Sequence, residues 1–527
     1  MSSDIKFDAI VIGSGIGGLT VASILSKIKN YKVLVLERHF KAGGFTHEFS
    51  RQQKFHWDVG LHYVGEMEKG NMMRGIFNFI TDNQVKWNKM LDPFEKFVYP
   101  DFIFDVYSDA KKYENDLIQK FPNEALSIQK YFKDLSKVSS WARKKGVIDK
   151  LPNWIQMVYS FFTSETEGIA NSTTLDYLNN TFQDAKLKAV LVSLWGDYGL
   201  PPAMSAFMLH ASIAYHYLKG GYYPEGGAGK IAESILPIIQ KYGGDILINC
   251  KVEEIIIENG KAVGVRAEEK RGGKVEEKRF YADHVFSNTG AATTYCDLLQ
   301  RQPGIETIKS EIDKEKERGY TTVTLYIGLK DSPEALGFKG ENYWIYTGYD
   351  HDEMEKRKDE LLEGKPVCCF LSFPSLKTSG AKAHTAEIIA PIGYKPFEEW
   401  SKQPWKKRDY KYYDLKEKMA TALIGLIEER FPGFQDLIEY YELSTPLSVE
   451  NFTGHYKGNI YGVLHTLDKE KYKWIGSRTP IPNLYLCGTD VSSHGIIGAM
   501  MGGVISAAEL VGFMKIFKEA GKYKNSL

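Results

Sequence analysis

The segment Lys6–Gly44, KFDAIVIGSGIGGLTVASILSKIKNYKVLVLERHFKAGG, decides the fold. The apolar run Ala9–Ile12 predicts a buried strand, and the glycine-rich turn behind it leads into a helical pattern that begins at Leu19. A second apolar run, Val33–Leu36, ends at the acidic residue Glu37. Strand, glycine turn, helix, second strand and acidic residue, in this order, are the fingerprint of a dinucleotide-binding Rossmann unit.

The glycines of this turn are expected to have separate tasks. Gly13 permits the tight turn, Gly15 lets the backbone approach a pyrophosphate, and Gly18 lets the helix pack closely on the strand. A carboxylate at Glu37 accepts hydrogen bonds from ribose hydroxyls, and the later glycine pair brings further N–H groups near the cofactor. The predicted cofactor contacts in this segment are Gly13, Gly15, Ile16, Gly17, Gly18, Glu37, Arg38, Gly43, Gly44, Phe45 and Thr46.

Composition narrows the class of protein. At 527 residues the chain is longer than a single hydrophobic core usually supports, so two or more structural units are expected. Lys plus Arg equals Asp plus Glu, at 67 each, which gives no reason to expect a nucleic-acid partner. The five cysteines have no metal-ligand spacing, so no metal site is predicted. Their pattern is consistent with a protein that resides in a reducing compartment.

The sequence shows no pattern typical of a signal peptide or a transmembrane segment. Residues 1–8 are polar and run directly into the first strand, and no apolar run reaches the length that spans a bilayer. We therefore expect a cytoplasmic protein without signal peptide or transmembrane span, either soluble or peripherally associated with a membrane.

Three further segments carry a family resemblance. Asp58–Gly65, DVGLHYVG, follows the Gly43–Gly44 pair, and together they resemble the phytoene desaturase, carotenoid isomerase and retinol saturase family, most closely its retinol saturase branch. The resemblance continues in the Y-P-x-G-G segment of Tyr223–Gly227 and in the strand-ending turn Gly488–Asp490. It implies non-covalently bound FAD and adds six predicted cofactor contacts: Val252, Asn288, Gly488, Asp490, Gly498 and Ala499.

The resemblance also implies a division of the chain. The fold class is α/β, a Rossmann-type FAD-binding domain of the glutathione-reductase and amine-oxidase kind with inserted substrate regions. Residues 1–75, 222–300 and 446–527 are expected to build the FAD-binding domain, 76–221 a mainly helical cap, and 301–445 a substrate domain with a mixed sheet.

Local patterns predict individual elements. The strand Asp245–Asn249 is expected to continue through Val252–Ile257, and Glu258–Lys261 reads as a hairpin turn. Apolar helical periodicity covers Ala189–Tyr217, and the last helix is expected to open after Ser493 and run to about Lys515. In the second sheet the predicted strands are Thr322–Leu329, Tyr343–Tyr346, Val367–Phe373 and Ala386–Ala390, followed by a helix over Leu415–Phe431.

The segment Leu151–Phe162, LPNWIQMVYSFF, is unusually apolar for one flanked by charged residues. It fits a helix that enters a membrane interface to collect a lipid substrate. It fits equally a buried helix of the cap, and the sequence leaves both interpretations open.

The resemblance predicts chemistry on a C=C bond of an apolar retinoid, carotenoid or other lipid substrate. A saturase would take hydride from N5 of the reduced flavin and a proton from a nearby acid. The predicted catalytic candidates are His62, Tyr63, His216, Tyr222 and His494, with His62 as the first choice; Tyr223, Thr453, His455 and Tyr461 are further residues near the site.

Three other functions stay open. Reduced flavin can isomerise a polyene without net redox change, oxidised flavin can desaturate it, and a flavin-carrying lipid-binding protein would have no turnover. No second G-x-G-x-x-G opens a helix after a strand, so a dedicated pyridine-nucleotide domain is not expected. NAD(P)H would have to reach the flavin through the substrate face, or electrons would pass to or from another, unknown protein.

Overall fold

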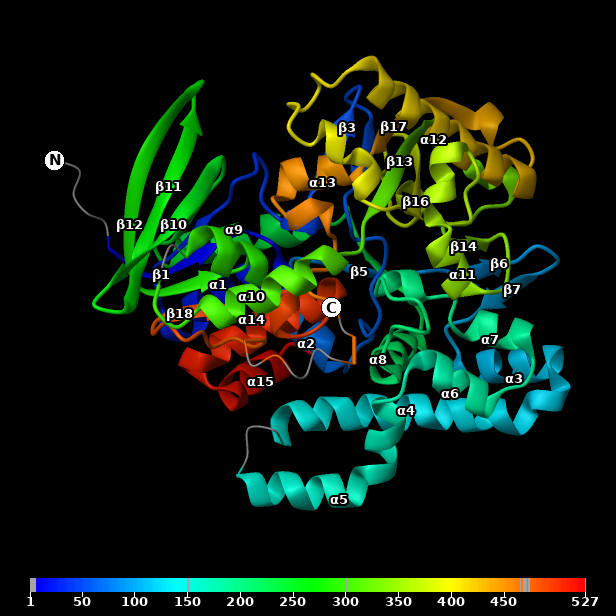
Figure 1. The fold of residues 1–527 in the computed structure, drawn as a ribbon, viewed down its shortest axis with the longest axis horizontal. Helices are drawn as coiled ribbons and strands as arrows, with labels where there is room; N and C mark the ends of the chain where they lie inside the picture. The colour runs from blue at the N-terminus through cyan, green and yellow to red at the C-terminus, as the bar shows by residue number, and fades with distance from the viewer. Residues whose placement is uncertain are drawn as a thin grey trace.

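The computed structural model describes residues 6–148, 152–299, 302–464, 466–467, 472 and 474–526. Residues 1–5 of the expected polar start and Leu151 of the apolar segment lie outside these ranges. The two largest sheets have seven strands each and stand side by side, with a helical region beneath the second (Figure 1).

The first sheet contains the glycine-rich turn. Its parallel part has the order β9-β2-β1-β12-β18, and β12 extends into an antiparallel meander with β11 and β10. The strands are β1 (Phe7–Ile12), β2 (Val33–Leu36), β9 (Asp245–Leu247), β10 (Cys250–Glu258), β11 (Lys261–Arg271), β12 (Lys274–Ser287) and β18 (Leu484–Leu486). The helices around it are α1 (Ile16–Lys29), α2 (Met72–Ile80), α9 (Lys230–Lys241), α10 (Glu306–Glu315), α14 (Gly495–Val511) and α15 (Phe513–Gly521).

Period-two alternation in β1 gives this sheet two buried faces. Ala9 and Val11 pack in one core cluster with α1, α9 and α14. Ile10 and Ile12 pack in another cluster with the β10–β12 meander and α10. Because both faces are covered, the strand reads as a continuous apolar run, as parallel strands do.

Two predictions in this region are wrong. β10 does not continue β9: β9 pairs with β2, whereas β10 pairs with β11 at the other edge of the sheet. Asn249 between them has φ of 54°, a left-handed conformation that interrupts the strand. The last long helix ends at Val511 rather than near Lys515, because Gly512 adopts φ of 86° and turns the chain into α15.

The second sheet separates a core from a cavity. Its order is β17-β13-β16-β15-β14-β6-β7, antiparallel except between β14 and β6. The strands are β6 (Glu95–Val98), β7 (Ile103–Val106), β13 (Thr322–Leu329), β14 (Asn342–Tyr346), β15 (Cys368–Ser372), β16 (His384–Pro391) and β17 (Ile438–Ser444). Val323, Leu325 and Ile327 of β13 pack with α12 (Tyr410–Arg430), while the alternate residues face the cavity described below.

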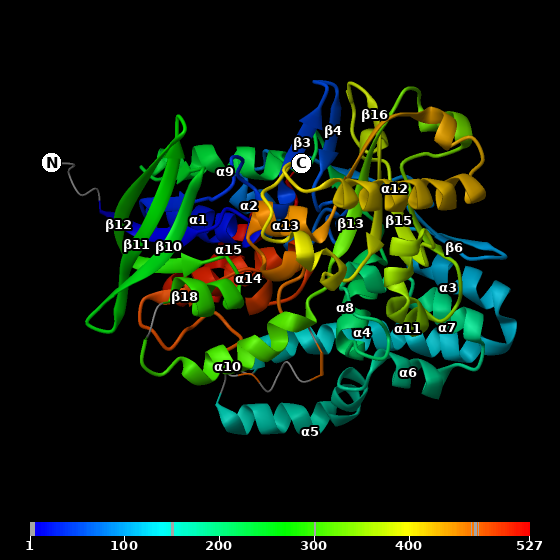
Figure 2. The same ribbon diagram turned by 45° about the horizontal axis from the view of Figure 1, so that its top comes forward.

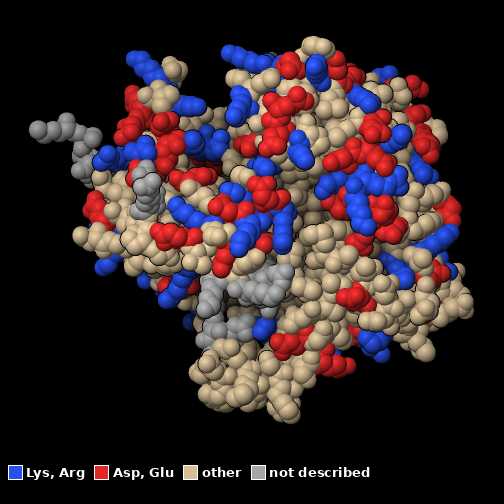
Figure 3. Space-filling model, viewed as in Figure 1, with Lys and Arg blue, Asp and Glu red and all other residues tan. Residues whose placement is uncertain are grey.

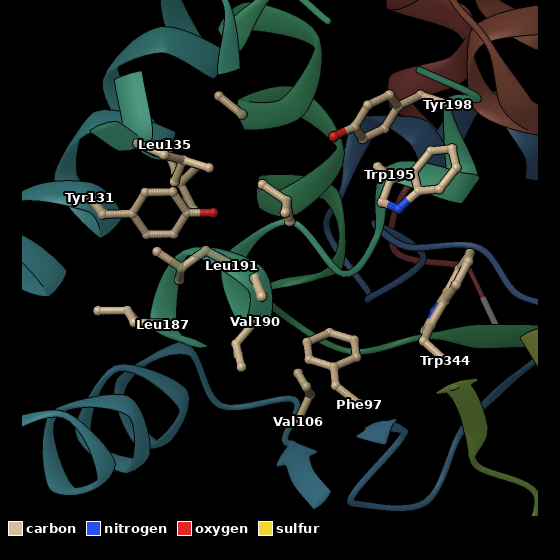
Figure 4. Packing of buried hydrophobic residues seen from close by; sticks show 14 of the residues in the cluster. Phe97, Val106, Tyr131, Leu135, Leu187, Val190, Leu191, Trp195, Tyr198 and Trp344 are labelled. Carbon is tan, nitrogen blue, oxygen red and sulfur yellow. The ribbon is translucent and has the colours of Figure 1, made fainter. Parts of the chain in front are cut away.

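The region expected as a helical cap contributes to this sheet as well. β6 and β7 lie within residues 76–221, yet they pair with β14. Its helices are α3 (Ala110–Lys120), α4 (Ala125–Ile148), α5 (Asn153–Ala170), α6 (Thr174–Thr181), α7 (Ala185–Leu191) and α8 (Phe207–Tyr217). Their apolar side chains form one cluster with Phe97 and Val106 of the two strands (Figure 4).

The helix predicted over Ala189–Tyr217 is wrong in extent. α7 ends at Leu191 and α8 begins at Phe207, with a short turn at Trp195–Asp197 and the dipeptide Pro201–Pro202 between them. Proline lacks the N–H that a continuous helix requires, so the apolar run breaks here. The break places Trp195–Asp197 against the second sheet.

Short strands and helices complete the connections. They are β3 (Glu48–Arg51) with β4 (Phe55–Asp58), β5 (Trp87–Lys89) with β8 (Tyr222–Pro224), α11 (His351–Lys356) and α13 (Pro446–Thr453). Among the described residues no single helix is long and apolar enough to cross a bilayer, although α14 and α15 together, bent by 119°, reach that length and composition.

α5 lies at the edge of the molecule with α4 beside it in both views (Figures 1 and 2). Trp154 is 64% exposed, Phe161 76% and Phe162 80%, so the buried-helix interpretation of this segment is wrong. Periodicity alone does not distinguish a helix whose apolar side is covered from one whose apolar side is bare.

Candidate functional site

A cavity of about 930 Å³ runs from the glycine turn after β1 to the inner face of the second sheet. Fourteen of the seventeen predicted cofactor residues line it; the others are Gly18, Gly43 and Gly498. Gly18 and Gly498 instead serve packing, because a Cβ would lie 2.3 Å from the Gly13 carbonyl oxygen and 2.1 Å from that of Ser493. The Gly43 N–H donates to Ser14 Oγ at 3.0 Å.

The glycine turn forms a cradle that no side chain can enter. A Cβ on Gly15 would lie 2.8 Å from Asn288 Nδ2, and one on Gly17 would lie 2.5 Å from Asn288 Oδ1 and 2.7 Å from the Cα of Gly488. The glycine turn, the segment at Asn288 and the segment at Gly488 are distant in sequence, and they therefore pack closely against one another beside the cavity. Such exposed backbone at a helix start is what a pyrophosphate requires.

Glu37 closes one side of this cradle. It follows β2 and is 7% exposed. Its Oε2 accepts hydrogen bonds from the N–H and the hydroxyl of Ser14 at 2.9 and 2.6 Å, and its Oε1 accepts from the His39 N–H at 2.7 Å. The carboxylate is thus held at the cavity wall beside Val252, where the ribose and adenine of a dinucleotide are expected.

Two helices present uncapped N-termini to the cavity. α1 has Gly15 and α14 has His494 at the N-cap, neither with a capping side chain, and neither helix has an acid in its first turn. Their first N–H groups can therefore receive a cofactor's negative charge. Asp490, just before α14, accepts from the N–H groups of Ala291 at 2.7 Å and Val463 at 2.9 Å.

These features fit a flavin dinucleotide. The glycine cradle, Glu37, Asn288, Asp490 and the two helix starts lie along one wall of a single cavity. When bound, FAD supplies hydride transfer to and from a substrate in the remaining volume.

The remaining volume is aromatic. Trp344 of β14 and Phe370 of β15 line it with their rings 4.7 Å apart, and Tyr326 of β13 lines it further along. Trp195 comes from the turn between α7 and α8 (Figure 4). A wall built from several rings suits an elongated apolar ligand.

Of the five predicted catalytic residues, His62 alone lines the cavity. Tyr63 lies behind the wall, and His216 Nε2 accepts from the Gly65 N–H at 2.7 Å. Tyr222 is buried in β8. The two ring nitrogens of His494 lie 3.1 Å from the carbonyl oxygens of Tyr198 and Val463. The further residues Thr453, His455 and Tyr461 all line the cavity.

Behind His62 lies a polar network that the sequence did not reveal. His62 Nδ1 is 2.8 Å from Oε2 of Glu387, which is fully buried in β16. Lys377 Nζ donates to the His62 carbonyl oxygen at 2.9 Å, to Asn342 Oδ1 at 2.6 Å and to Ser372 Oγ at 2.6 Å. Burial lowers the pKa of Lys377 to about 8.

A second polar network was also missed. The Tyr63 hydroxyl donates to Oδ2 of Asp197, which lines the cavity, at 2.8 Å. Burial raises the pKa of Asp197 to about 7 and that of Glu95 to about 8. The signal was available in W-G-D-Y-G at Trp195–Gly199, an acid between glycines within an otherwise apolar stretch.

Comparisons with known families agree with this geometry. Residues 11–79 match the family described as NAD(P)-binding Rossmann-like domain, and residues 227–305 match the family described as GMC oxidoreductase. A solved structure of an oxidoreductase from Methanosarcina mazei superposes with a TM-score of 0.60 at 18% identity, over 98% of this chain and 100% of its own. That likeness shows the shared fold.

Two curated relatives cover nearly the whole chain. All-trans-retinol 13,14-reductase of Danio rerio is 33% identical over 94% of this chain and 84% of its own length. The chloroplastic prolycopene isomerase of Daucus carota is 28% identical over 95% of this chain and 79% of its own.

The fold and the site define an FAD-dependent oxidoreductase. The chain belongs to the retinoid and carotenoid oxidoreductase family, with all-trans-retinol 13,14-reductases nearer to it than prolycopene isomerases. The predicted family is thereby confirmed.

We predict that Gly15→Val abolishes FAD binding. Gly15 lines the cavity, and its Cβ would already lie 2.8 Å from Asn288 Nδ2, so the branched side chain would fill the pyrophosphate position. The flavin absorbance per protein measures the effect. Gly425→Val in α12, where a Cβ meets no atom within 4 Å, is the control and should keep full occupancy. Full flavin occupancy in Gly15→Val would contradict the assignment.

Proposed function

We propose that this protein reduces a C=C bond of a retinoid or a related polyene. The observation that carries the proposal is the 33% identity to a retinol 13,14-reductase over 94% of the chain. The cavity supports it, because one wall suits FAD and the other presents Trp344, Phe370 and Tyr326 to an apolar chain.

Residue roles in the site follow from position. Gly13, Gly15, Glu37, Asn288 and Asp490 are proposed to hold FAD. His62 is proposed to act on the substrate, since its ring faces the aromatic part of the cavity 5.4 Å from the Phe370 ring. Lys377 holds the His62 backbone by donating to its carbonyl oxygen, and Glu387 Oε2 lies 2.8 Å from its ring Nδ1.

The reducing electrons are proposed to come from outside the chain. The sequence has one dinucleotide fingerprint, and the glycine turn that carries it is the cradle assigned to FAD. NAD(P)H or an electron-transfer protein would have to supply the cofactor during turnover.

α5 is proposed to contact a membrane surface from which the substrate enters. Trp154, Met157, Val158, Phe161 and Phe162 recur at helical spacing, and each is between 48% and 80% exposed. The lobe at the bottom of Figure 3, where Figure 1 places α5, is almost wholly free of charged side chains. A bare apolar helix face of this kind lies in the interface of a bilayer.

The activity test is anaerobic incubation of the flavin-loaded protein with all-trans-retinol. With dithionite as reductant we expect product heavier by two hydrogens in the mass spectrum, and a parallel reaction with NADPH tests that donor. An isomer shift of a poly-cis carotenoid without mass change would favour isomerisation instead. A product lighter by two hydrogens in the presence of an added oxidant would favour desaturation. If the flavin is bound and none of these reactions occurs, the protein is a flavin-carrying binding protein.

We predict that His62→Ala keeps bound FAD and lowers turnover by about a hundredfold, the usual size of a proton-transfer or orienting contribution. The alanine removes the imidazole that faces the substrate and leaves the cofactor wall intact. Flavin absorbance and the unfolding temperature provide the controls. Unchanged turnover would exclude His62 from the reaction.

For α5 we predict that Trp154→Ser, Phe161→Ser and Phe162→Ser combined weaken binding to phosphatidylcholine vesicles by tenfold or more, roughly the minimum that loss of three large apolar side chains implies. Co-flotation with vesicles measures binding. Met514→Ser in α15, at a side chain 85% exposed, is the matched control and should bind normally. Equal flotation of the triple variant would remove α5 as the contact.

A further inference from the structure

Reducing a C=C bond places one proton on carbon inside an apolar cavity. The group that gives it must hold a proton without free access to water and must reach the cavity. Asp197 meets both conditions: its side chain lines the cavity, and the Tyr63 hydroxyl donates to its Oδ2 at 2.8 Å from behind.

Within the described part of the chain, no cation acts on Asp197 to stabilise its charged form. Burial raises the pKa of Asp197, and the hydrogen bond from Tyr63 lowers it. The groups on which the charge of Asp197 itself acts are Glu95 and six tyrosines: Tyr63, Tyr198, Tyr217, Tyr320, Tyr346 and Tyr461. Among the described ion pairs none contains Asp197 or Glu95. A carboxyl group without a cation in an apolar wall favours its neutral form.

Glu95 strengthens this preference. It lies fully buried in β6, where its Oε1 accepts from Trp344 Nε1 at 3.1 Å. Within the described residues its Oε2 accepts no hydrogen bond of good geometry, although the Tyr63 hydroxyl is near enough to lower its pKa. The charge of Asp197 raises the pKa of Glu95, and the Tyr63 hydroxyl lies between the two carboxyl groups. Among the described residues, the cation that acts on Glu95 is Lys377, whose ammonium donates to three other oxygens. Two carboxyl groups in such a site do not ionise together, so the pair retains a proton.

We propose that Asp197 is the proton donor of the reaction, with Tyr63 as the positioning residue that orients its carboxyl group and Glu95 as the neighbouring buried acid that favours its protonated form. The proposal rests on the proposed function. The Asp197 O–H bond breaks and its proton bonds to one alkene carbon, while the hydride that bonds to the other carbon, with its two electrons, comes from the reduced flavin. The resulting carboxylate keeps the hydrogen bond from Tyr63 and takes a proton from water before the next turnover.

His62 is a less suitable donor in this geometry. Its Nδ1 lies 2.8 Å from Oε2 of the buried Glu387, so this ring nitrogen contacts the protein and not the substrate. His62 then serves by contacting and orienting the substrate, which agrees with its place on the aromatic wall.

The proton on Asp197 can be measured without turnover. We expect wild type to lose absorbance in the protonated-carboxyl infrared band between pH 6 and pH 9, and the part of that change that belongs to Asp197 should be missing from Asp197→Asn, in which the buried Glu95 still contributes. Asp414→Asn, at an exposed position of α12, is the control and should leave the band unchanged. Tyr63→Phe removes the hydrogen bond that lowers the pKa of Asp197, so the midpoint of the band should move to higher pH.

Turnover gives the second measurement. We expect Asp197→Asn to retain flavin and lose about 10²- to 10⁴-fold in the rate of double-bond reduction, and Asp197→Glu to recover part of it. The wild-type rate should fall as pH rises through about 7, because the donor must be protonated, and the fall should move upward in Tyr63→Phe.

The outcomes separate this proposal from the proposed function. A wild-type rate in Asp197→Asn, or no Asp197-dependent band at pH 6, overturns Asp197 as the donor while the function stands. If the wild-type protein reduces no polyene although the band titrates as expected, the proposed function fails and the proton-holding site stands.

Discussion

The structure depends on the direct contact of two helix backbones. α1 and α14 cross where a Cβ on Gly503 would lie 2.3 Å from the Gly17 carbonyl oxygen, and one on Gly502 would lie 1.9 Å from that of Gly488. No other residue type allows this approach. The contact joins the beginning and the end of the chain and directs both helix N-termini into one cavity. The cofactor wall exists only because these glycines let the segments meet.

The second sheet builds the opposite wall by alternation. Along β13 every second side chain packs on α12, and the intervening Thr322, Thr324 and Tyr326 line the cavity. The same alternation in β14 turns Trp344 and Tyr346 inward and Ile345 outward. One sheet thus supplies a domain core and a substrate surface, since a strand presents successive residues to opposite faces.

Local signals explain why much of this was predictable. The strand, turn and helix of Phe7–Lys29 and the strand Thr322–Leu329 follow from apolar patterning and glycine placement within a few residues. The separation of β9 from β10 depended on one left-handed residue, Asn249, that patterning does not detect. The two polar networks on the cavity wall could not be predicted from local patterns, because their members are far apart in the sequence. Tyr63 and Asp197 are 134 positions apart, and His62 and Glu387 are separated by an even longer stretch of chain.

The buried carboxyl groups show which polar side chains hold the structure together and which are kept for chemistry. Backbone N–H groups donate to both oxygens of Glu37 and of Asp490, as a carboxylate requires, and these contacts tie loops to the cofactor wall. Asp197 accepts a hydrogen bond from the phenol of Tyr63, and Glu95 Oε2 accepts none from the described residues. Burying such groups costs free energy that an apolar replacement would avoid. Asp197 lines the cavity, and Glu95 lies buried behind Trp344 of its wall, so proton transfer rather than folding is the reason we propose for both.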